Sequence, residues 1–596
     1  MSMLDQPENT RITSPLLQDI TTAKDFIAGL AGKGAPTTLP PISAALASTR
    51  AVTDLPPDTR LAIVCLLDEA AAALLPALLD SYLAAEGAQN VGAPDLFRDA
   101  IKLRQDGGSQ TVRIARQEPT TPYQLDCISE LWQALADFSQ QAATAYSFCL
   151  GECLSAAHRD ANKPVQGLSS EKLAWVAARA TRLMGLQLKL HLMRYLPIEA
   201  AFWQDFFHLY RFALAHQITA TLVSPYAPQT RKTSVQLEFL RALLLEVASP
   251  DALTPMQIEL AYRMTGRFAP AFDFLDQPGE RCGYYINLGE PAEPGYLDRE
   301  AAFASANLRF FGGGAALEKM EQIVKQNELG TIDHEMRFGD EYTADEKLAV
   351  LKHLQIFWAA NPPRRRQERK GVNVDIDVCH DFSTIKNQVA QIESEATFNL
   401  TPEIAAWLRD QAHAGTDDAA ADFAPEAWTA QDVSGKGVGA TIPPQMGYWV
   451  KIGRLCGIKS QSSETWWVGV VRRLRTDAQH ARHIGIALLA RKPVAAWLRA
   501  PRTRLASPAM PVDKPLAPAT EPRDVSSDYD YLHVILLPDE HQAFAQATAL
   551  APRQSFKPEQ VFEILMGDKR RSLKFVDLLE RGADFDHIRI QWLSMV

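Results

Sequence analysis

The chain changes character within residues 361–378, which read NPPRRRQERKGVNVDIDV. The proline pair at 362–363 must end any helix that precedes it, because proline lacks a backbone donor and restricts the residue before it. Residues 372–378 then alternate apolar and polar side chains with period two, which is typical of a half-buried strand. This stretch therefore separates a helical part of the chain from a β-rich part.

Before the proline pair, residues 1–345 are expected to form one large all-α region. Alanine and leucine are frequent there, and apolar residues recur three and four positions apart. Two capping boxes predict helix starts, one at Thr254 with Gln257 and one at Thr343 with Glu346. We expect this region to serve interaction and regulation.

A small β domain is expected over residues 346–500. Its first part is the helix that leads up to the proline pair, and its strands follow the proline pair. Besides residues 372–378, strands are expected at residues 448–452, 466–474 and 483–489. Residues 380–425 read as an insertion into this domain, with a helical middle and the acidic, alanine-rich stretch 416–422.

The last part of the chain begins with a proline-rich segment. Residues 501–526 are expected to form a semi-rigid linker, because they contain six prolines, few aromatic residues and no periodicity. Residues 527–596 are expected to form a small, β-rich C-terminal α/β module, with strands at 531–537, 561–565 and 587–592. The expected fold class is therefore multidomain α+β.

Composition sets outer limits on these expectations. The chain has 596 residues, too many for one hydrophobic core, so several folding units are expected. Its net charge of -10, from 61 Lys and Arg against 71 Asp and Glu, argues against a nucleic-acid surface along the whole chain. Seven cysteines are too few for a disulfide framework and are typical of cytosolic thiols.

The sequence contains no pattern that predicts a membrane span. Its N-terminal residues lack the apolar core of a secretory signal. The most apolar stretch, residues 61–83, contains three acidic residues and a proline, whereas a span needs about 20 predominantly apolar residues. We therefore expect a buried helix there and a cytoplasmic protein.

The strongest local anomaly is the basic run at residues 364–370. Five of its seven side chains are cationic, although the chain is acidic overall. A basic run is most often a solvated linker, but a second pattern downstream changes this interpretation. Residues 432–437 read DVSGKG and place an acid, a hydroxyl and two glycines in a turn between two β-rich runs.

Together the two patterns resemble the PilZ domain family, the bacterial receptor module for cyclic di-GMP. The RxxxR motif of that family is matched by Arg365 and Arg369, and its D/NxSxxG motif by Asp432, Ser434 and Gly437. The resemblance implies a six-stranded antiparallel β-barrel that binds cyclic di-GMP as a ligand, without a further cofactor and without a metal.

The resemblance covers about residues 364–495, less than a quarter of the chain. It departs from the family in spacing, because the insertion at residues 380–425 separates two motifs that usually lie one short strand excursion apart. A surface loop tolerates such an insertion, since the entropy of loop closure grows slowly with length.

The resemblance also implies roles for individual residues. Arg365 and Arg369 would clamp the ligand, while Asp432, Ser434 and Gly437 would line a guanine pocket; Arg364, Arg366 and Gly435 would be auxiliary. The chemistry agrees, because a guanidinium group binds both phosphate and the guanine edge through a two-pronged fork. A carboxylate can accept hydrogen bonds from guanine N1–H and its amino group, and glycine permits close approach of a ligand.

The resulting hypothesis is a signalling protein that is not an enzyme. Cyclic di-GMP would bind at the arginine-rich junction, change the arrangement of the domains and so alter binding of a protein partner by the helical region. Motility, pili, secretion, adhesion or biofilm exopolysaccharide could each be the output.

Three alternatives stay open. The first is that the barrel is a protein-binding scaffold that binds no nucleotide. The second is that the arginine run binds single-stranded nucleic acid, although the net acidity of the chain and the lack of an aromatic platform beside the run argue against it. The third alternative is an unrecognised activity in residues 1–340.

Overall fold

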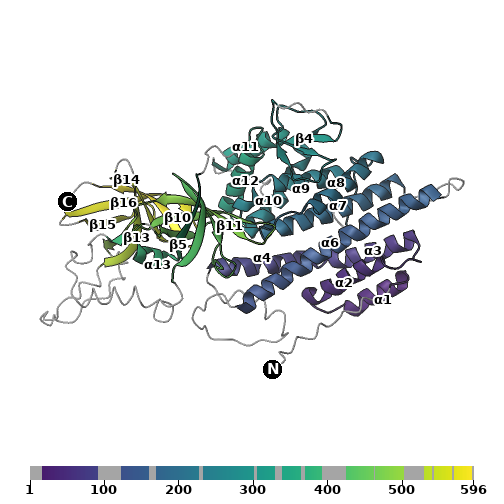
Figure 1. Cartoon of the computed structure of the whole chain (residues 1–596), viewed down its shortest axis with the longest axis horizontal. Coiled ribbons are helices and arrows are strands. Elements are labelled where there is room, and N and C mark those ends of the chain that lie inside the picture. The colour runs from purple at the N-terminus through teal and green to yellow at the C-terminus, as the bar shows by residue number, and fades with distance from the viewer. Residues whose placement is uncertain are drawn as a thin grey trace, which may run out of the picture. The chain divides into compact units, whose positions relative to one another are not determined.

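The structure is a computed structural model, and it describes part of the chain in detail. The described residues are 17–91, 122–159, 169–226, 232–300, 305–328, 338–363, 370–391, 424–461, 463–501, 529–539, 543–566 and 569–593. The chain divides into two compact units, Met1–Arg364 and Arg365–Val596, which contain the helices and the barrels of Figure 1 respectively. Each unit is described by itself below.

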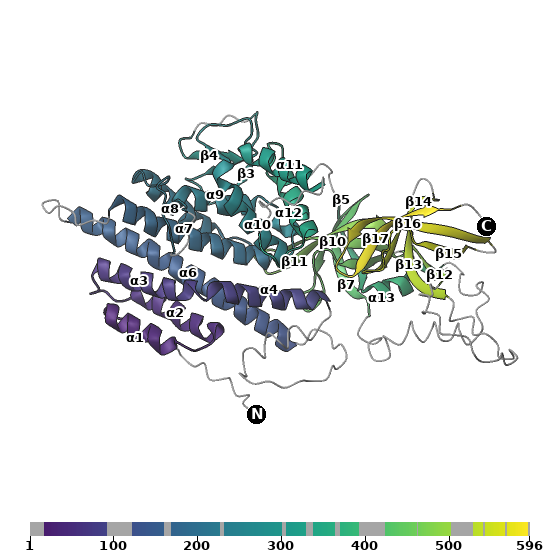
Figure 2. The same ribbon diagram turned by 180° about the vertical axis from the view of Figure 1, so that it is seen from behind.

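The first unit is built mainly from α-helices. In chain order they are α1 Ile20–Leu30, α2 Ala35–Thr49, α3 Pro57–Ala72, α4 Leu75–Val91, α6 Pro122–Arg159, α7 Ser170–Met193, α8 Ala200–Ala215, α9 Val235–Glu246, α10 Pro255–Phe268, α11 Gly314–Glu328 and α12 Ala344–Phe357. The long helix α6 lies between α2 and α3 on one side and α7 on the other, as Figures 1 and 2 both show. It therefore organises the core of this unit.

Both capping boxes expected from the sequence are confirmed. Thr254 accepts a hydrogen bond from the Gln257 N–H, and the Gln257 side chain accepts one from the Thr254 N–H, so α10 begins where predicted. Thr343 and Glu346 make the same reciprocal pair at the start of α12. Each box satisfies backbone donors that the first helical turn would otherwise leave unpaired.

A small antiparallel sheet adds to the helices of the first unit. Its strands are β1 Asp273–Leu275, β2 Tyr284–Asn287, β3 Gly295–Tyr296 and β4 Leu308–Gly312, in the order β1-β4-β2-β3. The sequence analysis expected only helices here. It missed these strands because each has two to five residues, too few for a period of two to stand out.

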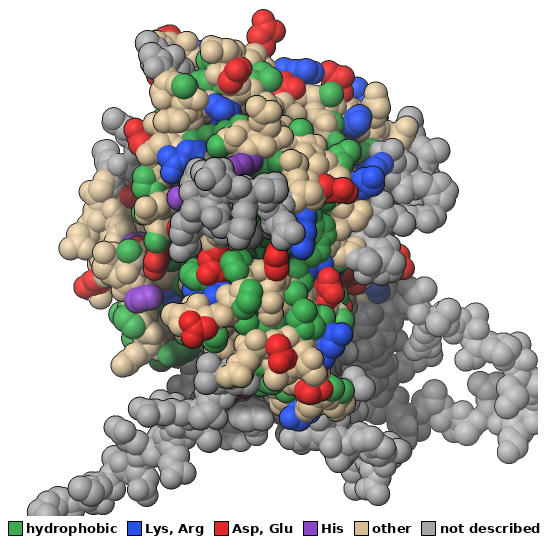
Figure 3. All heavy atoms as spheres, turned by 90° about the vertical axis from the view of Figure 1, so that its right-hand side faces the viewer, with side chains coloured by type: hydrophobic (Ala, Val, Ile, Leu, Met, Phe, Trp, Pro, Cys, Tyr) green, Lys and Arg blue, Asp and Glu red, His purple; other side chains and the backbone are tan. Residues whose placement is uncertain are grey.

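Charges of both signs are mixed on the face of the first unit that Figure 3 shows. Acidic and basic side chains are interspersed there among hydrophobic and polar ones. On this face the described residues thus form no broad patch of positive charge, which a nucleic-acid backbone would require. Within the described ranges, no single helix has both the length and the apolar character to cross a membrane; Pro57–Ala72 and Leu75–Glu86 meet that test only as a pair bent by 44°.

The second unit contains a closed six-stranded antiparallel barrel, as expected. Its strands are β5 Lys370–His380, β7 Glu426–Ser434, β8 Gly437–Ile442, β9 Leu455–Ser460, β10 Trp467–Thr476 and β11 Arg482–Ala490, and their order around the barrel is β10-β11-β8-β7-β5-β9. The strands expected within β5, β10 and β11 are confirmed. The helix α12, which the sequence analysis grouped with this domain, packs on α10 and α11 in the first unit.

The prediction of a strand at residues 448–452 is wrong. These residues form turns between β8 and β9. Gly447 and Gly453 flank them with φ values of 69° and 82°, which an extended strand does not allow. The Glu426 carboxylate also holds this loop, accepting hydrogen bonds from the Gly447 N–H and the Trp449 indole at 2.9 Å each.

A second barrel follows in the same unit. It consists of β12 Val494–Pro501, β13 Tyr529–Asp539, β14 Ala543–Pro552, β15 Val561–Met566, β16 Lys569–Arg581 and β17 Phe585–Trp592, and it closes because β12 pairs with both β13 and β15. The three strands expected in the C-terminal module are confirmed. Residues 501–526, expected to link two domains, instead connect β12 to β13, which are neighbours in one barrel.

A shared hydrophobic cluster connects the two barrels. The short helix α13 Phe382–Gln388 contributes Phe382 and Ile385 to a cluster with Leu455 of the first barrel and Ile535 of the second. The short strand β6 Ala390–Gln391 adds to β12 in parallel. Of the expected insertion, the structure describes residues 380–391, which include α13 and β6, and residues 424–425, whereas the acidic stretch 416–422 lies outside the described residues.

Candidate functional site

One end of the first barrel brings several strand termini together. Ser434 at the end of β7 pairs with Gly437 at the start of β8, and Gly437 pairs with Ala487 near the end of β11. On the other side of β7, Val433 pairs with Lys370, the first residue of β5. We call this end, formed by residues 370–371, 432–437, 467–468 and 487–491, the hairpin rim.

The DVSGKG pattern is the hairpin between β7 and β8, with Gly435 and Lys436 as its turn. Asp432 and Ser434 are half-buried, and the Ser434 hydroxyl donates to the Gly437 carbonyl at 3.3 Å. The structure thus brings Asp432, Ser434, Gly435 and Gly437 together at the hairpin rim.

Two of the hairpin residues are glycines, and their surroundings differ. A Cβ on Gly437 would lie 2.9 Å from the Ile486 carbonyl oxygen, so only glycine lets β8 and β11 pair this closely. A Cβ on Gly435 would have no atom within 4 Å. The fold therefore explains Gly437, whereas at Gly435 the surface is open to an incoming molecule.

The arginines of the basic run, Arg364, Arg365, Arg366 and Arg369, lie outside the described residues. Their expected role as ligand clamps stays a prediction. The residues that follow these arginines are described: Lys370 pairs with Val433, and Gly371 pairs with Asp432. The basic run thus leads directly into the strand that lies beside the DVSGKG hairpin.

Sequence reasoning missed a cation at this rim. Arg491 follows the last residue of β11, and its Nη2 donates to the carbonyl oxygens of Ser434 at 3.2 Å and Gly435 at 3.5 Å. Its guanidinium carbon lies 4.9 Å from the centre of the Trp467 ring. No sequence spacing relates Arg491 to the hairpin, because the two come together only when β11 pairs with β8 in the closed barrel.

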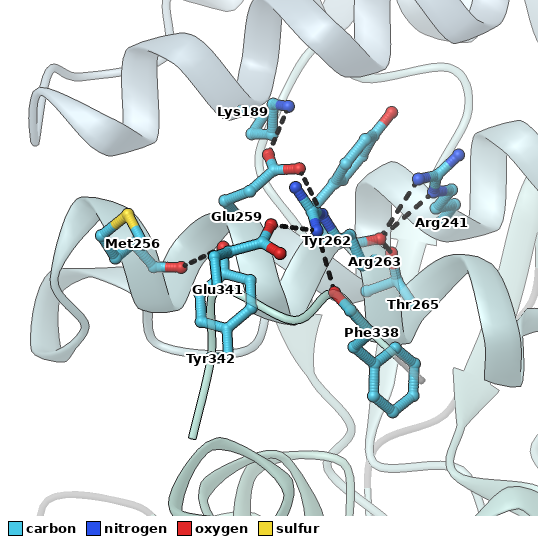
Figure 4. A network of polar contacts seen from close by, with 10 residues as sticks. All are labelled: Lys189, Arg241, Met256, Glu259, Tyr262, Arg263, Thr265, Phe338, Glu341 and Tyr342. Carbon is cyan, nitrogen blue, oxygen red and sulfur yellow. Dashed lines mark hydrogen bonds and ion pairs between the residues drawn. The ribbon is translucent and has the colours of Figure 1, made fainter. Parts of the chain in front are cut away.

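The first unit contains two networks of buried and half-buried charged residues. In Figure 4, Glu259 lies between Lys189 and Arg263, at 2.7 Å and 2.9 Å. Arg263 also binds Glu341 at 2.6 Å and the Phe338 carbonyl oxygen at 2.8 Å. Burial opposes ionisation of Glu259, but the charge and hydrogen bond of Lys189, together with Arg263, outweigh it and lower the pKa of this carboxyl.

This network connects three parts of the first unit. Lys189 belongs to α7, Glu259 and Arg263 to α10, and Glu341 to the segment just before α12. Each of these charges has a partner of opposite sign. We therefore assign the network a structural role, since charges that are already paired with one another leave little capacity to bind a ligand, whereas removal of one partner would strand a buried charge.

A second network in the first unit surrounds the fully buried carboxylate of Asp68. Asp68 accepts hydrogen bonds from Tyr146 at 2.8 Å, from Tyr226 at 3.0 Å and from Arg179 at 3.1 Å. The Arg179 guanidinium lies between the rings of Trp175 and Tyr226. This arrangement is also internally satisfied, and among the described residues no group of three or more His, Cys, Asp or Glu could hold a metal ion.

Comparison with protein families gives two matches. The family model described as the N-terminal domain of the cyclic-di-GMP receptor FimW matches residues 89–278, which include helices α6 to α10. The model described as the FimW C-terminal beta-barrel domain matches residues 520–593, which include β13 to β17. No curated protein matches the chain. The chain is thus similar to a cyclic-di-GMP receptor family on both sides of the first barrel.

Proposed function

We propose that this chain is a receptor for cyclic di-GMP and that the ligand binds at the hairpin rim of the first barrel. The two family matches, of which one carries the receptor description, flank that barrel in the sequence. The pairing of Lys370 with Val433 is the observation that supports the site most directly. One peptide bond separates Arg369 from Lys370, so chain connectivity keeps the basic run close to the DVSGKG hairpin.

The proposed roles follow from the chemistry of the ligand, which has two phosphodiester anions and two guanines. Arg365 and Arg369 bind phosphate and the guanine edge through their guanidinium forks. Asp432 accepts from guanine N1–H and the amino group, and Ser434 adds a hydroxyl contact. Gly437 lines the pocket, and the auxiliary residues are Arg364, Arg366 and Gly435.

The expected affinity is that of a regulatory switch. A hydrogen bond to a charged group contributes about 1.5–3 kcal/mol net. Three or four such bonds, less the cost of ordering an arginine-rich segment, correspond to a dissociation constant on the order of micromolar.

The test is calorimetric titration of the full chain with cyclic di-GMP. The Arg365→Ala/Arg369→Ala double variant should lose binding by about a hundredfold or more, since it removes at least two charge-assisted contacts. Its thermal unfolding should not change, because the six strands that close the barrel include neither residue. Arg475→Ala is the matched control, as Arg475 is an exposed arginine near the other end of β10.

Three results would argue against the proposal. Undiminished affinity in the double variant would remove the arginines from the site. Failure of the unaltered chain to bind cyclic di-GMP would favour a barrel that serves only as a scaffold, and tight, steeply salt-dependent binding of oligonucleotides would favour a nucleic-acid binder.

We further propose that binding acts through the basic run on the two units. The run joins the first unit to the second, so ordering it around an anion would restrict how the units can be arranged. A ligand shifts such an equilibrium only by its difference in affinity for the two arrangements. The helical unit would then bind its protein partner in one arrangement more strongly than in the other.

A further inference from the structure

The turn of the DVSGKG hairpin is held by groups from the end of β11. The Leu488 N–H donates to the Lys436 carbonyl at 3.0 Å. Arg491 donates to the two preceding carbonyls, those of Ser434 and Gly435. Three consecutive carbonyl oxygens of the turn are therefore engaged by one neighbouring segment, and the side chain of Arg491 binds two of them.

Arg491 is itself held in a fixed orientation. Its guanidinium group rests on the ring of Trp467, the first residue of β10, in a cation–π contact. Its Nε atom is shielded from solvent and has no acceptor among the described residues. The hydrogen bonds of Nη2 and the indole ring are thus the described contacts that position this side chain.

The charge of Arg491 also matters at this place. The turn presents the carbonyl oxygens of Ser434 and Gly435, whose partial negative charges disfavour an anionic ligand beside them. A guanidinium bound to those carbonyls offsets this negative potential before any ligand arrives.

We propose that Arg491 is a positioning residue for the ligand site, which fixes the hairpin in its binding shape by holding the Ser434 and Gly435 carbonyls while it rests on Trp467. This inference rests on the proposed function, since it concerns the same site. A hairpin that is ordered beforehand binds more tightly, because less freedom is lost on association.

The experiment measures cyclic di-GMP affinity and thermal unfolding in the full chain with Arg491→Ala and Arg491→Lys. Arg491→Ala should weaken binding about tenfold, the equivalent of losing one charge-assisted contact. Arg491→Lys should recover only part of that loss, because an ammonium group keeps the charge but lacks the planar guanidinium face that stacks on the indole ring.

Arg482→Ala is the matched control. Arg482 begins β11 and donates to two loop carbonyls, those of Met446 and Gly447, at the opposite end of the same barrel. Its loss should lower the unfolding temperature as much as Arg491→Ala does, yet leave affinity unchanged. A purely structural role for Arg491 would instead give both variants the same affinity.

Hydrogen exchange without ligand provides a second readout. In Arg491→Ala, the backbone amides of residues 434–437 should exchange faster than in the unaltered chain, whereas Arg482→Ala should leave them unchanged. Unaltered affinity or unaltered exchange in Arg491→Ala overturns the inference alone. Absence of binding in the unaltered chain overturns the proposed function, and the inference with it.

Discussion

Gly435 and Gly437 stand two residues apart in one hairpin, and the structure separates the fold requirement at Gly437 from the binding requirement proposed at Gly435. Gly437 faces a backbone oxygen of a paired strand, which cannot move without breaking the sheet. Gly435 faces open space. Single methyl groups at these positions can therefore distinguish the two requirements.

Gly437→Ala should destabilise the second unit by about 1–3 kcal/mol, as overpacking does in other cores. Gly435→Ala should stay within about 0.5 kcal/mol of the unaltered chain, as surface substitutions usually do, but should weaken cyclic di-GMP binding by crowding the ligand. Thermal unfolding and calorimetry on both variants check this. Full affinity in Gly435→Ala would exclude Gly435 from the site.

At the scale of the element, burial lowers the pKa of three half-buried histidines in described strands of the second unit: His380 ends β5, His533 lies in β13 and His587 in β17. Burial, with a smaller contribution from Arg454, lowers the pKa of His380 to about 4. Burial and the charge of Lys386 lower the pKa of His533 to about 3, and burial also lowers the pKa of His587.

These shifts predict how stability depends on pH. Between pH 6.5 and about 4 the unfolded chain binds protons that the folded strands exclude, so stability is full above pH 6.5 and falls as the pH decreases. Each such histidine contributes at most about 1.4 kcal/mol per pH unit. Unfolding of His533→Gln should depend less on pH than that of the unaltered chain, whereas His480→Asn, which alters an exposed turn, should follow the unaltered chain. Equal slopes for all three would contradict the prediction.

The elements that the sequence predicted are those whose signals are local. The strand at 372–378 and both capping boxes depend on neighbouring residues, so their patterns can be read directly. The turn that contains Asp432 and Ser434 could likewise be predicted, because the DVSGKG pattern stands between two β-rich runs of the sequence. In contrast, the contact of Arg491 with that hairpin depends on pairing between strands far apart in the chain, which no local pattern encodes.

At the scale of the whole molecule, the basic run joins two segments that are each fixed in their own unit. On the first side, the Trp358 indole donates to the Leu244 carbonyl, and Pro362 is buried. On the second side, Lys370 pairs with Val433. The seven peptide steps between Pro363 and Lys370 can span about 25 Å at most.

A tether of this length makes the proposed coupling measurable. Small-angle scattering of the full chain should show a narrower distribution of interatomic distances with saturating cyclic di-GMP than without it, because an ordered tether allows fewer arrangements. The Arg365→Ala/Arg369→Ala variant should show no such change. Superimposable curves for the unaltered chain with and without ligand would refute the coupling.

The proline-rich segment has a consequence for how this molecule can be divided. Because β12 and β13 pair along their lengths, from Val494 with Leu536 to Pro501 with Tyr529, the segment between them connects two strands of one barrel instead of separating two domains. After cleavage by a protease within this segment, the pairing of β12 with β13 would hold the two fragments together. A shortened chain that stops at residue 500 would keep strand β12 without the other strands of its barrel. The unpaired backbone groups of that strand would make the shortened chain prone to self-association.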